Sequence, residues 1–470
     1  MAAAEHVDAV VVGGRCAGAA AGIALARAGR RVVVLDRAQF PSDTLSTHLL
    51  FPAGLAEVKA LGAYERVMAT GAPEHREASV GGGGFHAQSP YSPNNGVTHG
   101  ACIRRSGFDA ALAATAREAG AELRERTKVT RLLYDAGRVA GVAYETRDGQ
   151  AGELRAPLVV GADGRQSAIA RELGVSDPYR WNKNQRACYF TYVEDESDDR
   201  SRNVAAQWRE GAELGTAFPC DDGLLLVLLM PPVGRAGEFK RDLEGEYRRT
   251  IAAIPGLQER IGGGKIASKV RMATETTSFF RRSSGKGWAL AGDAGHFKDP
   301  VTAQGMRDAM RFGRLLGEMA APTIGDVAAL DRALASWERL RERECIETYQ
   351  WTNQLARAEA MTPIEVELYR EISSDADKTR ELLDVFSRQR KPSRVLSPAR
   401  VGRLVARAWR NPELDNGELA RAVRRDGPQT VKDAITRART RAIIPGRRPS
   451  GPGASARPRS PMRTMESSTT

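Results

Sequence analysis

Short apolar runs and helix-forming stretches alternate near the start of the chain. Val10 to Val12 is an apolar run that ends at a glycine pair, and Ala17 to Ala28 consists of small, helix-forming residues. A second apolar run, Val32 to Leu35, follows Gly29 and closes at Asp36. This order predicts a strand, a glycine turn, a helix and a second strand parallel to the first.

The pattern changes further along and divides the chain. Residues 1–180 and 281–330 combine apolar strands with helices, whereas residues 181–280 show alternating and β-branched segments typical of an antiparallel sheet. Residues 331–443 keep a helical spacing of apolar positions. We therefore expect an α/β fold with a discontinuous Rossmann-like domain, an inserted β-sheet domain and a helical C-terminal region. The Pro- and Gly-rich residues 444–470 are expected to be disordered.

Two stretches of the first domain are expected to be loops. Thr44 to His48, between Pro41 and Pro52, is dense in hydroxyl groups, which suit either turn chemistry or hydrogen bonding to a ligand. Gly81 to Gly84 predicts a flexible turn, followed by an aromatic and polar loop that ends near Gly100.

The first glycine turn has the features of a dinucleotide site. A helix N-terminus offers unpaired N–H groups to a pyrophosphate, provided that glycines allow close approach. In the usual G-x-G-x-x-G fingerprint, an acid about 20 residues further on binds a ribose. Gly13 and Gly18 fit the first and third glycines, Asp36 lies 23 positions after Gly13, and Arg15 takes the second glycine position. We expect a dinucleotide site, with a purely structural strand–helix–strand unit as the alternative.

Composition narrows the class of protein. With 470 residues, 41% hydrophobic and 27% charged, the chain suits a soluble globular protein of two or three domains. The net charge of +12 is concentrated in residues 388–470, which hold 20 Lys and Arg against 6 Asp and Glu. Because the remainder is close to neutral, we expect no nucleic-acid partner.

The cysteines and the apolar segments indicate in which cellular compartment the protein is expected. The five cysteines are odd in number and form no C-x-x-C pair, which indicates a reducing compartment and no metal site. The N-terminus has no room for a signal sequence before the first strand, and Leu224 to Met230 is too short to cross a bilayer. The sequence therefore predicts a cytoplasmic protein without a membrane span.

Two later segments repeat the combination of a strand, a glycine turn and an acid. Gly161 to Gly164 contains Asp163 and precedes a helix, and Gly292 and Asp293 lead into a helix over 304–319. Together with the first turn, these motifs resemble, over residues 8–317, the FAD-dependent single-component hydroxylases of the p-hydroxybenzoate hydroxylase type. The sequences of residues 15–18 and 43–48 resemble those of a subgroup of flavoproteins related to geranylgeranyl reductases. In that subgroup an arginine at the second glycine position is usual.

The resemblance implies an FAD site. Gly13 to Gly18 would hold the pyrophosphate, Asp36 the adenosine ribose and Asp293 a ribityl hydroxyl. Arg104 would reach the phosphates, and the helix start at 303–306 would face the flavin N1 and O2 edge, where the family's Gly-Gln-Gly reads Ala-Gln-Gly. The positions implied to bind the cofactor are Gly13, Gly14, Arg15, Ala17, Gly18, Asp36, Arg37, Arg104, Asp163, Gly292, Asp293, Pro300, Ala303, Gln304, Gly305 and Met306.

The resemblance also implies an activity. NADPH or NADH would reduce the flavin, with Asp163 serving both cofactors, and a flavin C4a-hydroperoxide formed with molecular oxygen would hydroxylate an aromatic or polyketide-like molecule of secondary metabolism. The substrate would lie between the two lobes, bordered by the Thr44 to His48 loop, by the sheet of the second lobe near Phe218 and Pro219, and by the segment His296 to Pro300. His48, His296 and Lys298 are the candidate acids and bases, although their place in a polar loop beside FAD would explain them equally well.

Three alternatives stay open. A prenyl reductase of this fold would carry a Y-x-W-x-F-P pattern, of which Phe218 and Pro219 keep only the end. A flavin halogenase would carry a W-x-W-x-I-P stretch, which the chain lacks. The chain could also be a flavin-binding partner protein that works through its basic C-terminal region.

Overall fold

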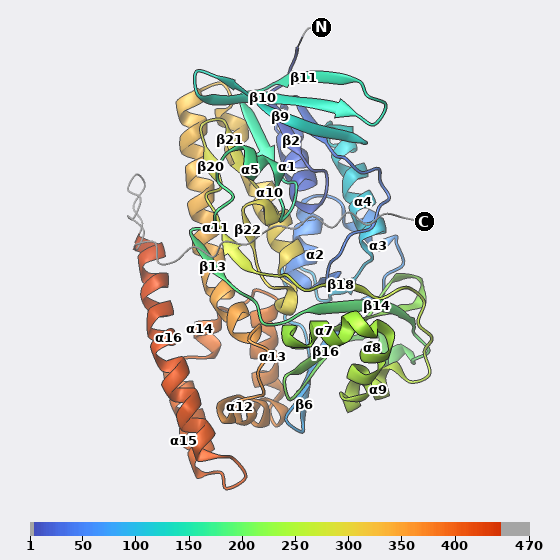
Figure 1. The fold of residues 1–470 in the computed structure, drawn as a ribbon, viewed down its shortest axis with the longest axis vertical. Helices are drawn as coiled ribbons and strands as arrows, with labels where there is room; N and C mark the ends of the chain where they lie inside the picture. The colour runs from blue at the N-terminus through green and yellow to red at the C-terminus, as the bar shows by residue number, and fades with distance from the viewer. Residues whose placement is uncertain (1–3, 443–470) are drawn as a thin grey trace.

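The structure is a computed structural model that describes residues 4–442 (Figure 1). Its centre is a six-stranded sheet of order β20-β21-β12-β2-β3-β8, parallel except for β20. Buried valines fill the central strands, as expected for a parallel sheet covered on both faces. The strands are β2 (Ala9–Val12), β3 (Val32–Leu35), β8 (Glu122–Arg124), β12 (Leu158–Gly161), β20 (Ser284–Gly285) and β21 (Trp288–Leu290).

Two helices pack side by side and position the site, the first against this sheet and the second against the first. Helix α1 (Cys16–Arg27) follows β2 directly, and α10 (Gly305–Ala320) lies against it. A Cβ at Gly313 would lie 2.3 Å from the carbonyl oxygen of Ala17, so the close contact requires glycine. Since Gly313 faces the start of α1, the start of α10 extends about 12 Å beyond it, at 1.5 Å per residue.

A seven-stranded sheet, of order β18-β14-β17-β16-β15-β5-β6, forms the second lobe. Its only parallel pair among the described residues joins β5 to β15. The strands are β5 (Glu77–Gly82), β6 (Phe85–Pro90), β14 (Cys188–Glu194), β15 (Val204–Glu210), β16 (Glu213–Pro219), β17 (Leu224–Leu229) and β18 (Arg271–Ala273).

The predicted turn at Gly81 to Gly84 was therefore wrong in its first half. Gly81 and Gly82 belong to strand β5, and only Gly83 and Gly84 form the turn, with φ of 58° and 79°. A Cβ at Gly81 would lie 2.7 Å from the Trp208 ring, so this glycine makes room for a tryptophan on the neighbouring strand. Strands β5 and β6 thus bring residues 77–90 into the sheet, outside the expected limits of 181–280.

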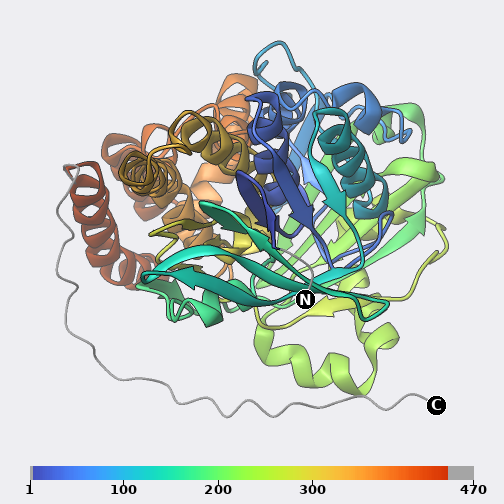
Figure 2. The same cartoon turned by 90° about the horizontal axis from the view of Figure 1, so that it is seen from above.

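Helices cover both flanks of this sheet (Figures 1 and 2). On one flank Phe239 stacks on Tyr189, and the Tyr247 hydroxyl donates to the Val227 carbonyl. These helices are α7 (Ala236–Arg241), α8 (Leu243–Ala252) and α9 (Pro255–Ile261). The C-terminal helices lie on the other side, where α12 and α13 contact β6. They are α11 (Val327–Leu355), α12 (Pro363–Ser373), α13 (Ala376–Phe386), α14 (Pro392–Val395), α15 (Pro398–Arg410) and α16 (Asn416–Ala442).

Smaller elements complete the described chain. A four-stranded sheet consists of β1 (Glu5–His6), β9 (Thr127–Asp135), β10 (Arg138–Thr146) and β11 (Ala151–Arg155). The other strands are β4 (Leu49–Leu50), β7 (Ala101–Cys102), β13 (Arg180–Asn182), β19 (Ser278–Phe280) and β22 (His296–Phe297). The other α-helices are α2 (Pro52–Ala60), α3 (Tyr64–Met68), α4 (Arg105–Glu118), α5 (Ala168–Glu172) and α6 (Asp199–Arg202).

Two further predictions concern membrane-spanning helices and the last residues of the chain. Among residues 4–442, no helix is both long enough and apolar enough to span a bilayer. The expected disorder of residues 444–470 falls outside the described residues.

Candidate functional site

The glycine turn between β2 and α1 leaves the start of α1 open. Gly13 has φ of 104°, and a Cβ there would lie 2.4 Å from the Ala162 carbonyl oxygen. A Cβ at Gly18 would lie 1.7 Å from the Gly13 carbonyl oxygen, so both positions require glycine. The first turn of α1 has neither an acidic residue nor a side-chain cap. Its N–H groups can therefore bind an anion such as a pyrophosphate.

Asp36 and Arg15 border this turn. The Asp36 carboxylate accepts hydrogen bonds from the Gly14 N–H, at 2.7 Å, and from the Ala38 N–H, at 2.8 Å. Arg15 forms an ion pair with Asp109 of α4 and donates to the Ser42 hydroxyl at 2.9 Å. The arginine at the second glycine position thus ties the turn to α4 and to the loop after β3.

A second open region lies at the start of α10. Gly305 is exposed, with no atom within 4 Å of where its Cβ would be, and α10 has no side-chain cap. Ala303 adopts a left-handed conformation with φ of 50°, and the Gln304 amide donates to the Thr302 carbonyl at 3.1 Å. The residues before α10 thus form an ordered turn whose backbone faces free space.

Gly292 and Asp293 follow β21 and connect the two open regions. The Asp293 carboxylate has no hydrogen-bond partner among the described residues, and burial raises its pKa. A Cβ at Gly292 would lie 2.8 Å from the Ala17 Cβ, which places this turn against α1. A partly buried carboxylate without a partner, between two uncapped helix starts, suits an elongated ligand with phosphates at one end and hydroxyl groups in its middle. These features fit FAD.

Three other residues that were expected to bind the cofactor bond to protein groups or face solvent. The Arg104 Nε donates to Asp221 at 2.7 Å, and its guanidinium also pairs with Asp222, so this arginine ties α4 to the second lobe. Asp163 accepts from the Ala168 N–H at 2.7 Å through Oδ2, whereas its buried Oδ1 has no partner in the described chain. Arg37 is exposed.

His48 is completely buried. Its Nδ1 lies 2.8 Å from the Ser46 carbonyl oxygen, and its Nε2 lies 2.9 Å from the Tyr192 hydroxyl. Burial lowers its pKa to about 4, with a smaller contribution from Arg105. This neutral imidazole joins the loop after β3 to β14, and it does not line the pocket described below.

His296 and Lys298 belong to a buried cluster beside α10. The Lys298 ammonium lies 3.2 Å from His296 Nε2 and forms an ion pair with Asp308. Burial and the Lys298 charge lower the pKa of His296. The side chains of His296, Asp308 and Cys345 converge as metal ligands would, but the Lys298 ammonium already bonds two of them. A second cation there would be repelled.

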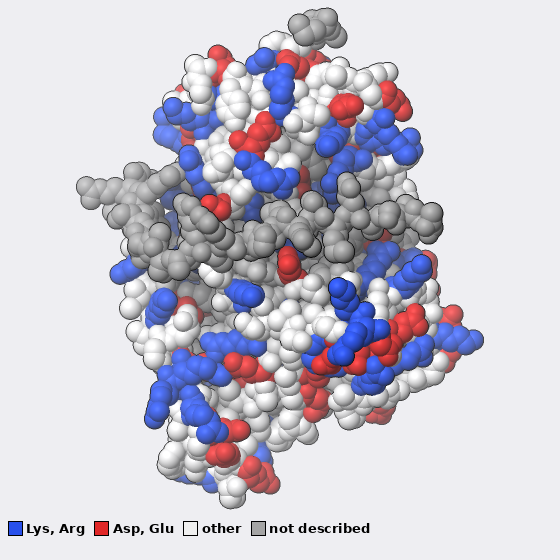
Figure 3. All heavy atoms as spheres, in the orientation of Figure 1, with Lys and Arg blue, Asp and Glu red and all other residues white. Residues whose placement is uncertain are grey.

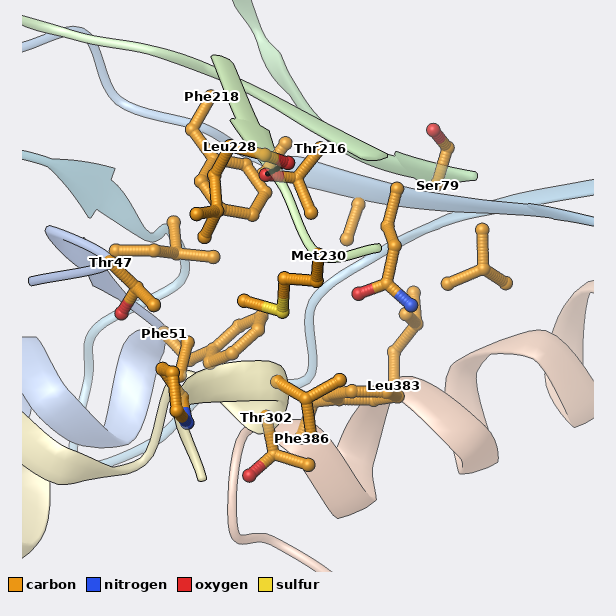
Figure 4. A pocket seen from close by; sticks show the side chains of 18 residues that line it. Thr47, Phe51, Ser79, Thr216, Phe218, Leu228, Met230, Thr302, Leu383 and Phe386 are labelled. Carbon is orange, nitrogen blue, oxygen red and sulfur yellow. Dashed lines mark hydrogen bonds between the residues drawn. The ribbon is translucent and has the colours of Figure 1, made fainter. Parts of the chain in front are cut away.

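An apolar pocket lies between the second lobe and α13 (Figure 4). About 470 Å³ of it is free of protein atoms, including space open to solvent. Phe218 and Leu228 come from the sheet, Leu383 and Phe386 from α13, and Ala303 from the turn before α10. The full lining is Thr47, Leu49, Phe51, Ala78, Ser79, Val80, Ala205, Gln207, Thr216, Phe218, Leu228, Met230, Pro300, Val301, Thr302, Ala303, Leu383 and Phe386.

The lining contains no ionisable side chain; its polar groups are hydroxyls and one amide. Three expected borders are present, at Thr47, Phe218 and Pro300. Sequence reasoning missed Ser79 on β5 and the α13 side chains. Only the helical spacing of Leu382, Val385 and Phe386 hinted at α13, and spacing alone does not show where a helix packs.

Comparison with known sequences defines the class. The family described as "FAD binding domain" matches residues 6–362. The chain is 28% identical over 361 residues to digeranylgeranylglycerophospholipid reductase 2 of Methanopyrus kandleri, with 73% of this chain and 84% of that protein covered. It is 27% identical over 365 residues to menaquinone reductase of Mycolicibacterium smegmatis, covering 75% and 84%. A 29% identical match to the digeranylgeranylglycerophospholipid reductase of Methanocella arvoryzae covers 51% of this chain and 59% of that protein.

Comparison with solved structures supports the fold. A flavoprotein/dehydrogenase from Cytophaga hutchinsonii has a TM-score of 0.71 at 20% identity and covers 82% of this chain and 93% of its own. PqsL, a probable FAD-dependent monooxygenase from Pseudomonas aeruginosa, has a TM-score of 0.62 at 19% identity, with coverage of 81% and 100%. Fold and site together define an FAD-dependent oxidoreductase. The chain belongs to the FAD-binding-domain family named above.

Proposed function

We propose that this enzyme reduces a carbon–carbon or quinone double bond in an uncharged, largely apolar substrate. The observation that carries the proposal is the pocket lining, which is apolar and has no ionisable side chain. A charged substrate would be buried there without a counter-charge, at a cost of several kcal/mol. The relative named as a menaquinone reductase supports this substrate class, whereas the phospholipid in the name of the other reductase carries a phosphate and would fit this lining only through its apolar chains.

The chain's own residues have separate roles in this proposal. The start of α1 holds the FAD pyrophosphate, Asp36 the adenosine ribose and Asp293 a ribityl hydroxyl. The start of α10, from Gln304 to Gly305, would stabilise negative charge on the bound ring system. Bound FAD would supply two electrons as a hydride, the proton that completes the reduction would come from solvent at the open side of the pocket, and NADPH or NADH is the expected reductant of the flavin. Phe218, Leu228, Leu383 and Phe386 exclude water and orient the substrate.

Hydroxylation is the second candidate. The segment Gly215 to Pro219 lacks the tyrosine and tryptophan expected in a prenyl reductase and keeps only the final Phe-Pro. In this case the substrate would be an aromatic compound and molecular oxygen the co-substrate. However, the pocket lining offers no base to activate a phenol.

One experiment separates the two reactions. The purified holoenzyme is reduced with NADPH or NADH without oxygen and then mixed with a menaquinone or a geranylgeranyl compound. We expect the flavin absorbance to return and a reduced product to form. If reoxidation instead requires oxygen together with an aromatic compound, and the product carries one additional oxygen atom, hydroxylation is correct and the proposal fails.

A further inference from the structure

Helix α16 exposes two large apolar side chains one turn apart. Val431 is 59% exposed and Ile435 48% exposed. Small residues recur at intervals of three, four or seven before and after them, so that they share one side of the helix. We call this side the outer stripe, and its members are Gly427, Val431, Ala434, Ile435 and Ala438; Arg424, seven positions before Val431, lies on the same side and marks its N-terminal end.

Basic side chains border the outer stripe. Lys432 and Arg439 are exposed, as is Arg424, and none of the three has an ion-pair partner among residues 4–442. Blue side chains are visible along this flank in Figure 3, over α15 and α16 of Figure 1. The border of the outer stripe is therefore positively charged.

The acidic residues in the body of α16 are turned toward the protein. Asp426 is paired with Arg357, which follows α11, and Asp433 is buried, where its carboxylate accepts from Gln429 at 2.8 Å. The helix thus separates its charges, with carboxylates on the packed side and unpaired cations beside the exposed apolar stripe. A helix that is exposed on all sides and stabilised by salt bridges between its own turns would not need its acidic and basic side chains on opposite sides.

We propose that the outer stripe of α16 docks this enzyme on an anionic phospholipid surface. A helix with an apolar side flanked by Lys and Arg lies in the plane of a bilayer interface, where lipid headgroups pair with the cations. A second copy of the chain fits less well, because a symmetric contact would bring the basic borders of two stripes together.

The inference concerns where the enzyme works, and the binding itself is independent of the reaction. Its link to catalysis rests on the proposed function, since an apolar substrate partitions into the bilayer. A test that reads only binding therefore distinguishes failure of docking from failure of the proposed chemistry.

The test is co-sedimentation of the full-length holoenzyme with vesicles. Vesicles of phosphatidylcholine with phosphatidylglycerol are compared with phosphatidylcholine alone, at low and high salt. We expect binding to the anionic vesicles that weakens with salt. The double variant Val431→Asp with Ile435→Asp should bind at least tenfold less, and Lys432→Glu with Arg439→Glu should show a similar loss.

The matched control reverses two exposed charges elsewhere, Lys128→Glu with Arg147→Glu, and should bind as the wild type does. All variants keep residues 443–470, so unchanged binding by the stripe variants would overturn the proposal. Equal binding to uncharged vesicles would also overturn it. A wild-type dimer in sedimentation velocity that becomes monomeric in the Val431→Asp and Ile435→Asp variant would instead assign the stripe to a second copy.

Discussion

At the scale of single residues, a few side chains bond to more than one partner and so connect separate elements. Arg15 takes the place of a glycine in the nucleotide turn, and its ion pair with Asp109 gives it a structural role there. Asp109 also accepts from Arg105 at 2.9 Å, so one buried carboxylate holds two arginines beside the turn. An arginine can occupy this glycine position because its long side chain extends from the start of α1 to Asp109 on α4.

Asp293 is the residue on which the cofactor assignment can be tested most directly. Asp293→Ala removes a carboxylate that has no other partner in the described chain, so we expect FAD affinity to fall about 10- to 100-fold, in line with about 1.5–3 kcal/mol for a charged hydrogen bond. Flavin absorbance of the purified variant and a titration with FAD measure this. Asp148→Ala, in an exposed turn, is the control, and wild-type flavin content in Asp293→Ala would contradict the assignment.

His48 predicts a pH dependence of stability. Its pKa of about 4 in the folded protein lies below the ordinary value of 6.5, so protonation favours the unfolded chain. The stabilisation is complete above pH 6.5 and is lost as the pH falls toward 4, by about 3 kcal/mol. In His48→Gln, the free energy of unfolding in denaturant should vary less over this range. His86→Gln, at an exposed position, should keep the wild-type slope, and identical slopes in all three proteins would refute the prediction.

At the scale of elements, the site is assembled where different segments meet. Helix α10 contributes its open N-terminus, the second lobe contributes a sheet face, and α13 closes the pocket with Leu383 and Phe386. Strand β5 contributes Ser79 because it joins the same sheet in parallel with β15. The pocket therefore depends on packing between elements that are far apart in sequence.

The role of α13 leads to a prediction about substrate binding. Leu383→Trp should fill part of the pocket and raise the KM for the substrate at least tenfold, while flavin content stays unchanged because the cofactor residues lie on other elements. Steady-state kinetics and flavin absorbance are the measurements. The volume-conserving Leu383→Ile should stay close to the wild type. An unaltered KM in Leu383→Trp would show that the substrate binds elsewhere.

At the scale of the whole molecule, the two lobes and the C-terminal helices form connected cores. The α1–α10 pair anchors the nucleotide domain, and α11 runs from that domain toward the pocket, where Thr352 bonds Thr302 at 2.9 Å. Positive charge accumulates at the C-terminal end of the chain, where residues 388–470 hold 20 Lys and Arg against 6 Asp and Glu.

The last residues should be dispensable for this architecture. Deleting residues 445–470 should leave flavin content and the thermal midpoint within error of the full chain, because the sequence of this Pro- and Gly-rich segment offers few apolar side chains for a core. Flavin absorbance and thermal unfolding measure the outcome. An insoluble or flavin-free truncation would assign the segment a structural role.

The sequence by itself determined the class of protein and the glycine turn that leads into α1. Gly13, Gly18 and Asp36 are recognisable because a phosphate site at a helix start needs glycines at fixed spacing, and this requirement is local. The three motifs in order also predicted FAD, and the family match confirms it.

Only the tertiary structure decided the pocket and the partners of charged residues. Gly81 looked like part of a turn but makes room for Trp208, and Arg104 is held by Asp221 from another lobe. His48 and Lys298 looked like acids or bases, yet burial gives each a fixed partner. Such contacts join residues more than 100 positions apart in most of these cases, and spacing along the chain reports only neighbours. The pocket lining likewise joins β5, β16, β17 and α13, so its shape is decided by packing between distant segments.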